Sequence, residues 1–473
     1  MITLIIDIYK RVKYFIYFNL FIASVLSCYI HYKITHKINY KLINILYSTI
    51  HLNGCILIKF IQWINTNVEL LDFNDNNTIY DLFSNFYENC KIHDLNYTKQ
   101  VFLNEFNTNF DNIIELDDTF QIKSGSIAQV YKGTYNNNVV AIKVVHPDTY
   151  YHMIFPVMYI KLYNFITNNI SYLSNYRCPF ILDNFFNNLS KQTDMINEFD
   201  NMVYFYNNYL NNPYILIPEP IYATDNILIM EFINGDTLTS INLNAYEKQK
   251  VVKLLNLFIK DHFFFKDYYH SDLHEANWKI IKYNDFYKIV IYDYGYTPEN
   301  NYNDLFQKFV YYNDTNDLDK MVKIIYPYCY NINSESEFLC KYNEYIKNKY
   351  NNDNEHIQEY FTDEIIRVVY NFIYANNISV HPAIVEVLIS LILIKKYIIK
   401  YLNVDRNNSL SFSANDILSG YISAIYTCNK YNIFPELKKY INETYINNSE
   451  FNNFYIFKNN FYDNLQINNN IDI

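Results

Sequence analysis

The stretch His270-Ser-Asp-Leu-His-Glu-Ala-Asn277 and the triplet Asp293-Tyr-Gly295 decide the fold of this chain. Between them lie two apolar, β-rich runs, 278–281 and 288–292, which flank an Asn-Asp pair of the kind found in tight turns. This pattern predicts a β-hairpin. The hairpin brings Asp293 back toward Asp272 and places two carboxylates near the carboxamide of Asn277.

The spacing of Asp272, Asn277 and Asp293 suits phosphoryl transfer from a nucleotide. In kinase-like enzymes one carboxylate positions the acceptor, while an amide oxygen and a second carboxylate hold the Mg²⁺ that neutralises the phosphates. Each residue alone means little. Together they predict Asp272 as a catalytic residue, Asn277 and Asp293 as metal ligands, and ATP with Mg²⁺ as cofactors.

Two charged residues upstream complete this pattern. Lys143 ends Ala141-Ile-Lys143 in a strand-like run, where such a lysine binds the α- and β-phosphates of kinase-like enzymes. Glu198 lies in a later helical pattern and is the expected partner of Lys143. The ordered set of strand Lys, helix Glu, Asp-x4-Asn and Asp-Tyr-Gly predicts a phosphotransferase or ATPase.

A metal-dependent hydrolase is a second interpretation of the same stretch. His270, Asp272 and His274 alternate along the chain, and imidazole and carboxylate groups commonly bind transition metals. This interpretation leaves Lys143 and Glu198 unexplained, so it ranks below phosphoryl transfer.

Strand and helix patterns follow one another in the order of an α+β protein. The runs 126–134 and 139–145 are joined through three Asn residues, whose side chains tolerate a left-handed turn, and a second hairpin is expected from 214–217 and 227–233. Helical patterns cover 151–173, 185–209 and 247–265. This order predicts a kinase-like two-lobed fold with an N-terminal helical extension and a helix-rich C-terminal lobe.

Several motifs together resemble those of the UbiB or aarF-domain-containing group of atypical, protein-kinase-like proteins. The stretch from His270 to Asn277 resembles the group's His-x-Asp-x-His-x-x-Asn signature, and Val140 to Pro147 resembles its strand-lysine pattern. The resemblance implies that Glu231 lies on the hinge strand and that an Ala-rich type of loop binds the nucleotide. The implied loop residues are Ser124, Gly125, Ser126, Ile127, Ala128, Gln129 and Val130.

Three positions depart from the group's pattern. Lys59-Phe-Ile-Gln62 resembles its Lys-x-Gly-Gln element with Ile61 in place of Gly, and Gln192-Thr-Asp194 resembles its Glu-x-Asp. The resemblance implies that Lys59 and Gln62 cap the nucleotide pocket. Added bulk and a lost carboxylate are expected to alter this cap, and Gly125 in place of Ala is expected to alter nucleotide preference.

These patterns divide the chain into five segments. They are an anchor-like segment, a helical extension, a kinase-like N-lobe with a helical insertion, a kinase-like C-lobe and an Asn-rich helical or irregular tail, expected at 1–48, 49–120, 121–235, 236–405 and 406–473.

The composition excludes several classes of protein. A chain of 473 residues with 50% hydrophobic residues can bury a full core, which excludes disorder throughout. A net charge of -11 argues against nucleic acid as a partner, because binding phosphate backbones requires a basic face. The 7 Cys form no CxxC pair, which favours free thiols in a reducing compartment.

Residues 14–30 carry no charge and have basic residues on both flanks. A run of this length is near the lower limit for a membrane span, and its basic C-terminal flank does not suit a cleaved signal peptide. It predicts a single N-terminal membrane anchor or an interfacial helix, with a buried aromatic-rich helix as the alternative.

The leading interpretation is a membrane-associated, ATP- and Mg²⁺-dependent kinase-like phosphotransferase or ATPase. The resemblance implies a small-molecule or lipid-linked acceptor, and the chain after Gly295 has no Ala-Pro-Glu segment for peptide docking. The alternative is a membrane-associated, nucleotide-binding regulatory scaffold, a pseudokinase without productive turnover. The presence of Asp272, Asn277 and Asp293 favours the enzyme.

Overall fold

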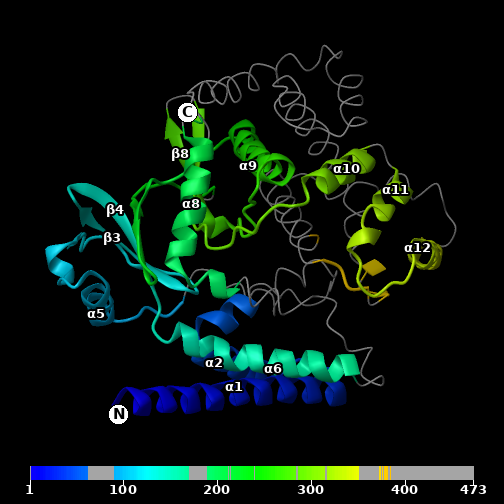
Figure 1. The fold of residues 1–473 in the computed structure, drawn as a ribbon, viewed down its shortest axis with the longest axis horizontal. Helices are drawn as coiled ribbons and strands as arrows, with labels where there is room; N and C mark the ends of the chain where they lie inside the picture. Colours follow the sequence, from blue (N-terminus) through cyan, green and yellow to red (C-terminus); the bar gives the residue numbers. More distant parts are fainter. Residues whose placement is uncertain are drawn as a thin grey trace. The chain divides into compact units, whose positions relative to one another are not determined.

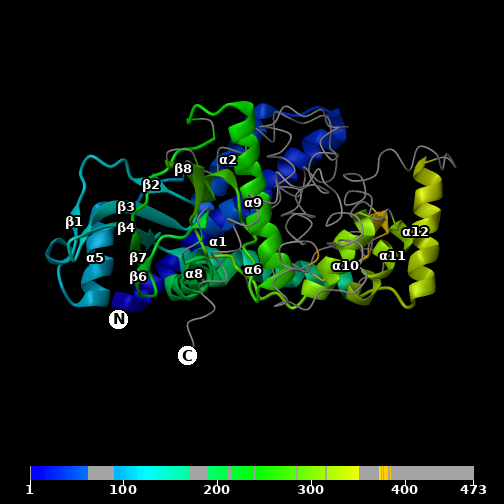
Figure 2. The ribbon, with the colours of Figure 1, turned by 90° about the horizontal axis from the view of Figure 1, so that it is seen from above.

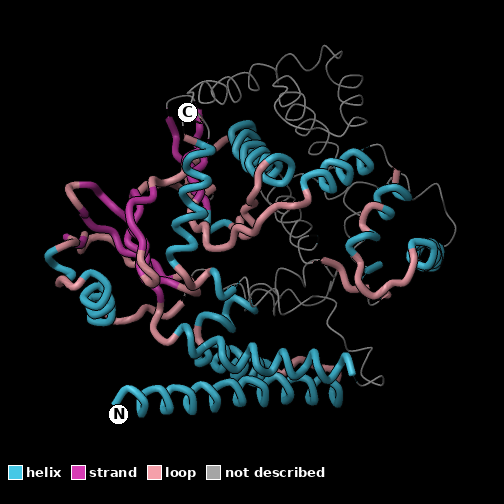
Figure 3. Tube along the Cα trace, viewed as in Figure 1, coloured by secondary structure: helices cyan, strands magenta, loops and turns pink. Residues whose placement is uncertain are grey.

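The computed structural model describes residues 2–61, 90–169, 189–210, 212, 215–238, 240–283, 286–314, 317–350, 372–373, 375–376, 378–381 and 384. The chain forms two compact units, and the division between them falls within helix α8 (Met195–Tyr209). The first unit comprises residues 1–178, 182–200 and 219–232, and the second comprises 179–181, 201–218 and 233–473. Each unit contains one β-sheet (Figures 1 and 3).

The sheet of the first unit has six strands in the order β1-β3-β4-β7-β6, with β2 also paired to β3. These strands are β1 (Glu115–Leu116), β2 (Lys123–Ser124), β3 (Ala128–Tyr135), β4 (Asn138–Val145), β6 (Pro220–Ala223) and β7 (Ile227–Glu231). The predicted hairpin of β3 and β4 is confirmed. Its turn residues Asn136 and Asn137 have φ of 50° and 64°, the left-handed conformation that a two-residue hairpin turn requires.

The expected second hairpin was wrong in its first strand. β7 pairs with β6, whereas β5 (Ile215–Leu216), which overlaps the expected run 214–217, pairs in parallel with β9 in the second unit. Both β5 and β6 are short apolar segments, so their apolar residues did not show which of them pairs with β7. The tight turn decides the pairing, because the Thr224 N–H donates to the Ile227 carbonyl at 2.8 Å and closes the chain on the nearer strand.

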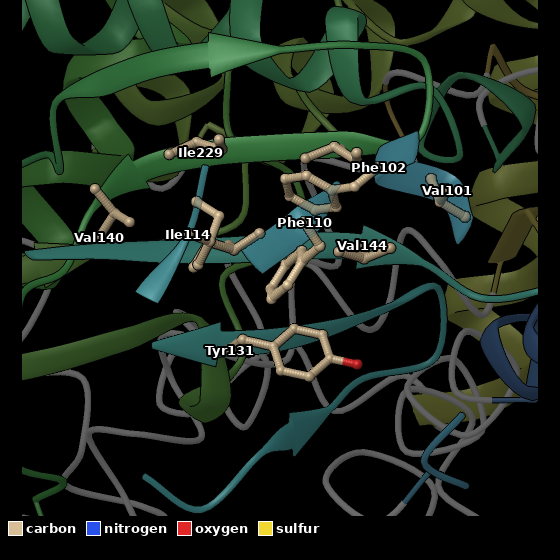
Figure 4. Packing of buried hydrophobic residues seen from close by; sticks show 10 residues of the cluster. Val101, Phe102, Phe110, Ile114, Tyr131, Val140, Val144 and Ile229 are labelled. Atoms are coloured by element: carbon tan, nitrogen blue, oxygen red, sulfur yellow. The ribbon is translucent and has the colours of Figure 1, made fainter. Parts of the chain in front are cut away.

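Helix α5 (Leu95–Phe106) packs on this sheet (Figures 1 and 2). The Asp94 side chain accepts from the Asn96 N–H and begins the helix. Phe102 is completely buried and lies with Val140 and Ile229 of the sheet in one hydrophobic cluster (Figure 4). This core holds β4, the strand that carries Lys143, in a rigid setting.

Besides α5 and α8, the first unit contains three longer helices, α1 (Ile2–Thr35), α2 (Tyr40–Asn53) and α6 (Thr149–Asn169). It also contains a short helix over 55–61, a helical turn at 189–191 and the 3-10 turn η2 (Phe110–Asn112). α1 lies beside α2 and α6 (Figure 1). Between α2 and the next helix, Gly54 has φ +78°, and a Cβ there would lie 2.2 Å from the His152 ring, so only glycine fits.

Among the described residues, one helix is long and apolar enough to cross a membrane, namely Leu4–Thr35 within α1. Its helical structure agrees with the sequence prediction for 14–30. One face of α1 is buried through Tyr14, Phe18 and Phe21, which recur at helical spacing. The buried-helix alternative therefore holds for this face only, because much of the rest of α1 is exposed and apolar.

The second unit carries the sheet β5-β9-β8, in which β8 (Trp278–Tyr283) and β9 (Phe286–Ile291) form the predicted third hairpin. α9 (Ala245–Phe265) contacts β9 and begins with a capping box between Asn244 and Glu247. The second unit also contains η4 (Glu275–Asn277), α10 (Asn303–Asp314), α11 (Leu318–Lys323), η5 (Tyr326–Tyr328) and α12 (Glu335–Tyr350).

Candidate nucleotide site

Lys143 and Glu198 form a buried ion pair in the first unit. The Lys143 Nζ donates to both Glu198 oxygens at 2.8 Å, and the side chains are 11% and 2% exposed. β4 holds Lys143 between Val130 of β3 and Leu228 of β7, and Glu198 lies in the first turn of α8. The structure thus joins the two residues that the sequence predicted as partners.

The start of α8 is organised by the altered Gln192-Thr-Asp194 motif. The Asp194 side chain accepts from the Ile196 N–H at 2.9 Å and so caps the helix four residues before Glu198. Gln192 is buried. This motif therefore acts locally by fixing where the helix begins, and so where the Glu198 carboxylate lies.

The predicted nucleotide loop runs from Ser124 of β2 to Val130 of β3, and residues 125–127 connect the two strands. Gly125 is exposed and Ser126 is half-buried, whereas Ile127 and Ala128 join a hydrophobic cluster with Val145. The Gly125 N–H donates to the Ala128 carbonyl at 3.0 Å. The tip at Gly125 and Ser126 is thus the part of the loop that the structure leaves accessible.

The stretch from His270 to Asn277 lies alongside the chain that follows β9, all within the second unit. The Tyr292 N–H donates to the Asn277 carbonyl at 2.8 Å, and the Ser271 N–H donates to the Tyr296 carbonyl at 3.2 Å. Asp272 directly follows Ser271, and Asp293 directly follows Tyr292. The predicted return of the hairpin toward Asp272 is observed.

Asn277 is fixed by a hydrogen bond from its Nδ2 to the Asp272 carbonyl at 2.7 Å. The residue is buried at the end of η4. This bond uses the nitrogen of the carboxamide and leaves its oxygen as the end that can bind a cation. The predicted ligands Asn277 and Asp293 offer oxygen atoms, which Mg²⁺ prefers, so these residues fit the ion.

Asp293 has φ 57°, a left-handed conformation that Asp adopts more readily than most residues. Its Oδ1 accepts from the Gly295 N–H at 3.2 Å. The next residue, Tyr294, is completely buried against Phe205 at 5.0 Å between ring centroids, and its carbonyl accepts from Asn201 at 3.0 Å. Burial of Tyr294 therefore anchors the turn that orients Asp293.

His270 is completely buried, and both of its ring nitrogens contact backbone atoms. Nδ1 accepts from the Asp272 N–H at 3.4 Å, and Nε2 lies 3.5 Å from the Tyr292 carbonyl. Burial lowers the pKa of His270, and the charges of Asp272 and Asp293 oppose part of that shift. His274 Nδ1 likewise accepts from the Ala276 N–H at 3.3 Å. The His274 Nε2 lies 3.9 Å from Asp272 Oδ2. The backbone contacts at both ring nitrogens favour a structural role for His270 over the hydrolase interpretation.

Three other predicted residues have separate settings. Lys59 lies on the helix over 55–61, close enough to Cys90 to lower the pKa of its thiol, although burial has the larger, opposite effect. Glu231 is exposed at the end of β7, where its carboxylate accepts from the Glu219 N–H at 3.2 Å. Gln62 lies outside the described residues.

Sequence reasoning missed one residue of the nucleotide loop's surroundings. His146 follows β4, and its Nε2 lies 3.0 Å from the Gly125 carbonyl. In the sequence, His146 stands out only as part of the run from Val140 to Pro147. Its place directly after the strand that carries Lys143 was the available signal.

Residues 86–325, just over half of the 473-residue chain, match the ABC1 atypical kinase-like domain, and the chain belongs to this family. The resemblance predicted from the motifs is therefore confirmed, together with a kinase-like α+β fold. The family membership supports a kinase-like, ATP-binding protein.

The probable serine/threonine-protein kinase abkC of Dictyostelium discoideum is 27% identical over 253 residues, which cover 49% of this chain and 34% of the relative. The chain thus matches about a third of that relative's length. A complex of Mycobacterium tuberculosis Rv3197 with erythromycin is similar at TM-score 0.44 and 15% identity, over 66% of this chain and 83% of the other. An ADP/Mg²⁺-phosphoaspartate complex of the Chaetomium thermophilum Rio2 kinase has TM-score 0.26 and 11% identity, covering 56% and 71%.

Proposed function

We propose that this chain is an Mg²⁺-dependent atypical kinase or ATPase that binds ATP. The buried Lys143–Glu198 pair is the observation that carries the proposal. Burying two charges costs free energy that a hydrophobic pair would not, so such a pair is retained more readily where its ammonium serves a function. Membership of the ABC1 family supports the same reading.

Each charged or polar residue of the candidate site has a distinct role in this proposal. Lys143 binds the α- and β-phosphates, and Glu198 holds its ammonium in place. Asp272 positions the acceptor hydroxyl or water and receives its proton. Asn277 and Asp293 would hold Mg²⁺, which when bound neutralises charge on the phosphates. The acceptor is a small molecule, a lipid-linked group or, for an ATPase, water.

Nucleotide binding and phosphate release by the full chain test this proposal. ATP with Mg²⁺ should raise the melting temperature of the native protein, because a ligand that binds the folded state stabilises it. Asp293→Asn keeps a residue that tolerates the left-handed conformation and should abolish the Mg²⁺-dependent part of the shift. Absence of any shift in a folded native protein at saturating nucleotide would refute the proposal.

The effect of Asp272→Asn separates the enzyme from the regulatory scaffold. The enzyme should lose phosphate release or transfer while it retains nucleotide binding, since this side chain acts on the acceptor. A scaffold should show nucleotide binding without turnover in the native protein and no change of cellular activity in the variant.

We further propose that α1 lies on a membrane surface. Its buried face is held by polar contacts, among them Tyr14 to Asp148 at 2.9 Å and Ser24 to Thr49 at 3.0 Å. The residues exposed on α1 are mainly large and apolar, including Leu4, Ile5, Ile8, Tyr9, Val12, Ile16, Leu20, Leu26, Ile30 and Ile34. A helix bound to protein on one side and apolar on the other suits the interface better than a free span.

Flotation of the full chain with anionic vesicles tests the membrane proposal. The double variant Ile16→Gln with Leu20→Gln should bind several-fold more weakly, because both side chains are about half exposed, at 51% and 48%. Tyr330→Gln, at a 57% exposed position in the second unit, is the matched control and should bind normally. Extraction by alkaline carbonate should release the protein, whereas a spanning anchor would resist it.

A further inference from the structure

Two histidines face each other beside the nucleotide loop, and neither has a role in the proposed catalysis. His93 precedes α5 and His146 follows β4, and their Nδ1 atoms are 2.8 Å apart. At that distance one Nδ1 must carry a hydrogen and the other must offer a lone pair. Burial lowers the pKa of both rings, that of His93 to about 4, so both are neutral near pH 7.

The hydrogen bond between His146 and the Gly125 carbonyl determines which of the two rings donates to the other. His146 Nε2 lies 3.0 Å from the Gly125 carbonyl, which can only accept, so the hydrogen of neutral His146 is on Nε2. The Ser124 hydroxyl, 3.4 Å from the same nitrogen, donates to the Lys91 carbonyl and is also able to accept. His146 Nδ1 is therefore the acceptor, and His93 donates from its Nδ1.

The opposite end of the network requires the same direction. Gln129 Oε1 accepts from the His93 N–H at 2.8 Å, so its Nε2 donates to the Tyr131 hydroxyl at 2.6 Å. Tyr131 then donates to Thr98 at 2.7 Å, and Thr98 donates to His93 Nε2 at 2.9 Å. The two ends agree, and a single directed relay runs from Gln129 through Tyr131, Thr98, His93 and His146 to Gly125.

The relay orients one peptide group of the loop tip. Every peptide bond described in the structure is trans, so the carbonyl of Gly125 and the N–H of Ser126 point in opposite directions. Holding the Gly125 carbonyl on His146 therefore turns the Ser126 N–H away from His146. The His146 N–H also donates to the Ile127 carbonyl at 2.9 Å, so this residue holds the loop at two points.

We propose that His93 and His146 are positioning residues that aim the Ser126 N–H at a phosphate of the nucleotide. This inference rests on the proposed ATP site and adds a specific donor to it. A glycine peptide rotates easily, and a rotated peptide would present a carbonyl to the phosphates instead of an N–H. The buried end of the relay, with Thr98 and Gln129 fully buried, resists that rotation.

Nitrogen NMR of the full chain labelled with ¹⁵N-histidine tests the relay independently of nucleotide. The shifts of neutral imidazoles should show hydrogen on Nδ1 of His93 and on Nε2 of His146, with assignments from His93→Gln and His146→Gln. The reverse pair of tautomers, or a mixture of both, would overturn the relay.

Affinities for ATP with Mg²⁺ and for adenosine test the role. His146→Leu removes the donor and should weaken ATP binding about tenfold, the size of one hydrogen bond, while adenosine, which lacks phosphates, binds as before. His146→Gln retains an N–H near the position of Nε2 and should recover most of the loss. Tyr131→Phe keeps the core volume and should weaken ATP binding less than His146→Leu does.

The outcomes separate this inference from the proposed function. Equal weakening of ATP and adenosine in His146→Leu would show a merely structural role and overturn the inference. Unchanged ATP affinity in a folded His146→Leu would also overturn it and leave the ATP site intact. If the native chain binds adenosine and ATP equally well, the proposed phosphate site itself is refuted, and the positioning role falls with it. Should His146→Leu fail to fold, Tyr131→Phe supplies the comparison, because it should weaken ATP binding and leave adenosine binding unchanged.

Discussion

Removal of the Lys143 ammonium takes away the cation that donates to both oxygens of the buried Glu198 carboxylate. In Lys143→Met, a side chain of similar length fills the space, but the Glu198 carboxylate, on a side chain that is 2% exposed, loses the Lys143 donor to both oxygens. Breaking a buried ion pair in this way costs about 3–5 kcal/mol. The 11% exposure of the Lys143 side chain admits some water, so we expect about 3 kcal/mol, the lower end of that range.

Thermal and urea denaturation of the full chain measure this loss. For a unit of this size, about 3 kcal/mol corresponds to roughly 6–12 °C in melting temperature. The double variant Lys143→Met with Glu198→Leu should recover most of the loss, because neither charge of the buried pair remains in the core. Neither variant should bind ATP as the native chain does.

The Lys132–Asp117 pair provides the matched control. It joins β3 to the loop between β1 and β2 at 2.7 Å, but its side chains are 28% and 27% exposed. Lys132→Met should therefore cost about 1 kcal/mol or less, as water and salt screen exposed pairs. Equal losses in Lys143→Met and Lys132→Met would refute the reasoning, because burial would then have no influence on the cost.

Three more predictions concern backbone space, pH and the loop. Gly54→Ala should destabilise the first unit by more than about 1 kcal/mol in a melting assay, because the φ of Gly54 is +78° and a Cβ would meet the His152 ring. Gly125→Ala should be tolerated in the same assay, because its Cβ would lie 3.7 Å from the Ala128 carbonyl. Burial lowers the pKa of His152 to about 4, below its unfolded value near 6.5. Between pH 4 and 6.5 the unfolded chain therefore binds more protons than the folded chain, so the melting temperature should fall on acidification from pH 7 to 4. His152→Gln should reduce that dependence, and an unchanged pH profile would contradict the assignment. Gly125→Ala should also change the ratio of ATP to ADP affinity, and identical ratios would remove the residue from nucleotide selection.

Much of the candidate site could be predicted because its chemistry depends on residue types at fixed spacing. The Asp272 to Asn277 stretch and the Asp293 turn are linked by a short hairpin, and local turn chemistry is sufficient to bring them together. The Lys143–Glu198 pair spans 55 residues, and it was predictable only because the two charges occur in a recognisable order. The first strand of the second hairpin was not predictable, since two short apolar runs competed for β7.

The sequence by itself determined the class of the protein, the β3-β4 and β8-β9 hairpins and the pairing of Lys143 with Glu198. Periodicity, turn residues and motif spacing are local properties, so they are legible without coordinates. Only the tertiary structure decided that His93, Thr98, Tyr131 and Gln129 form a relay to His146, and that one face of α1 is buried while much of the rest is exposed. The physical reason is that hydrogen-bond direction and burial depend on residues distant in sequence meeting within a few ångströms, which residue order alone does not specify.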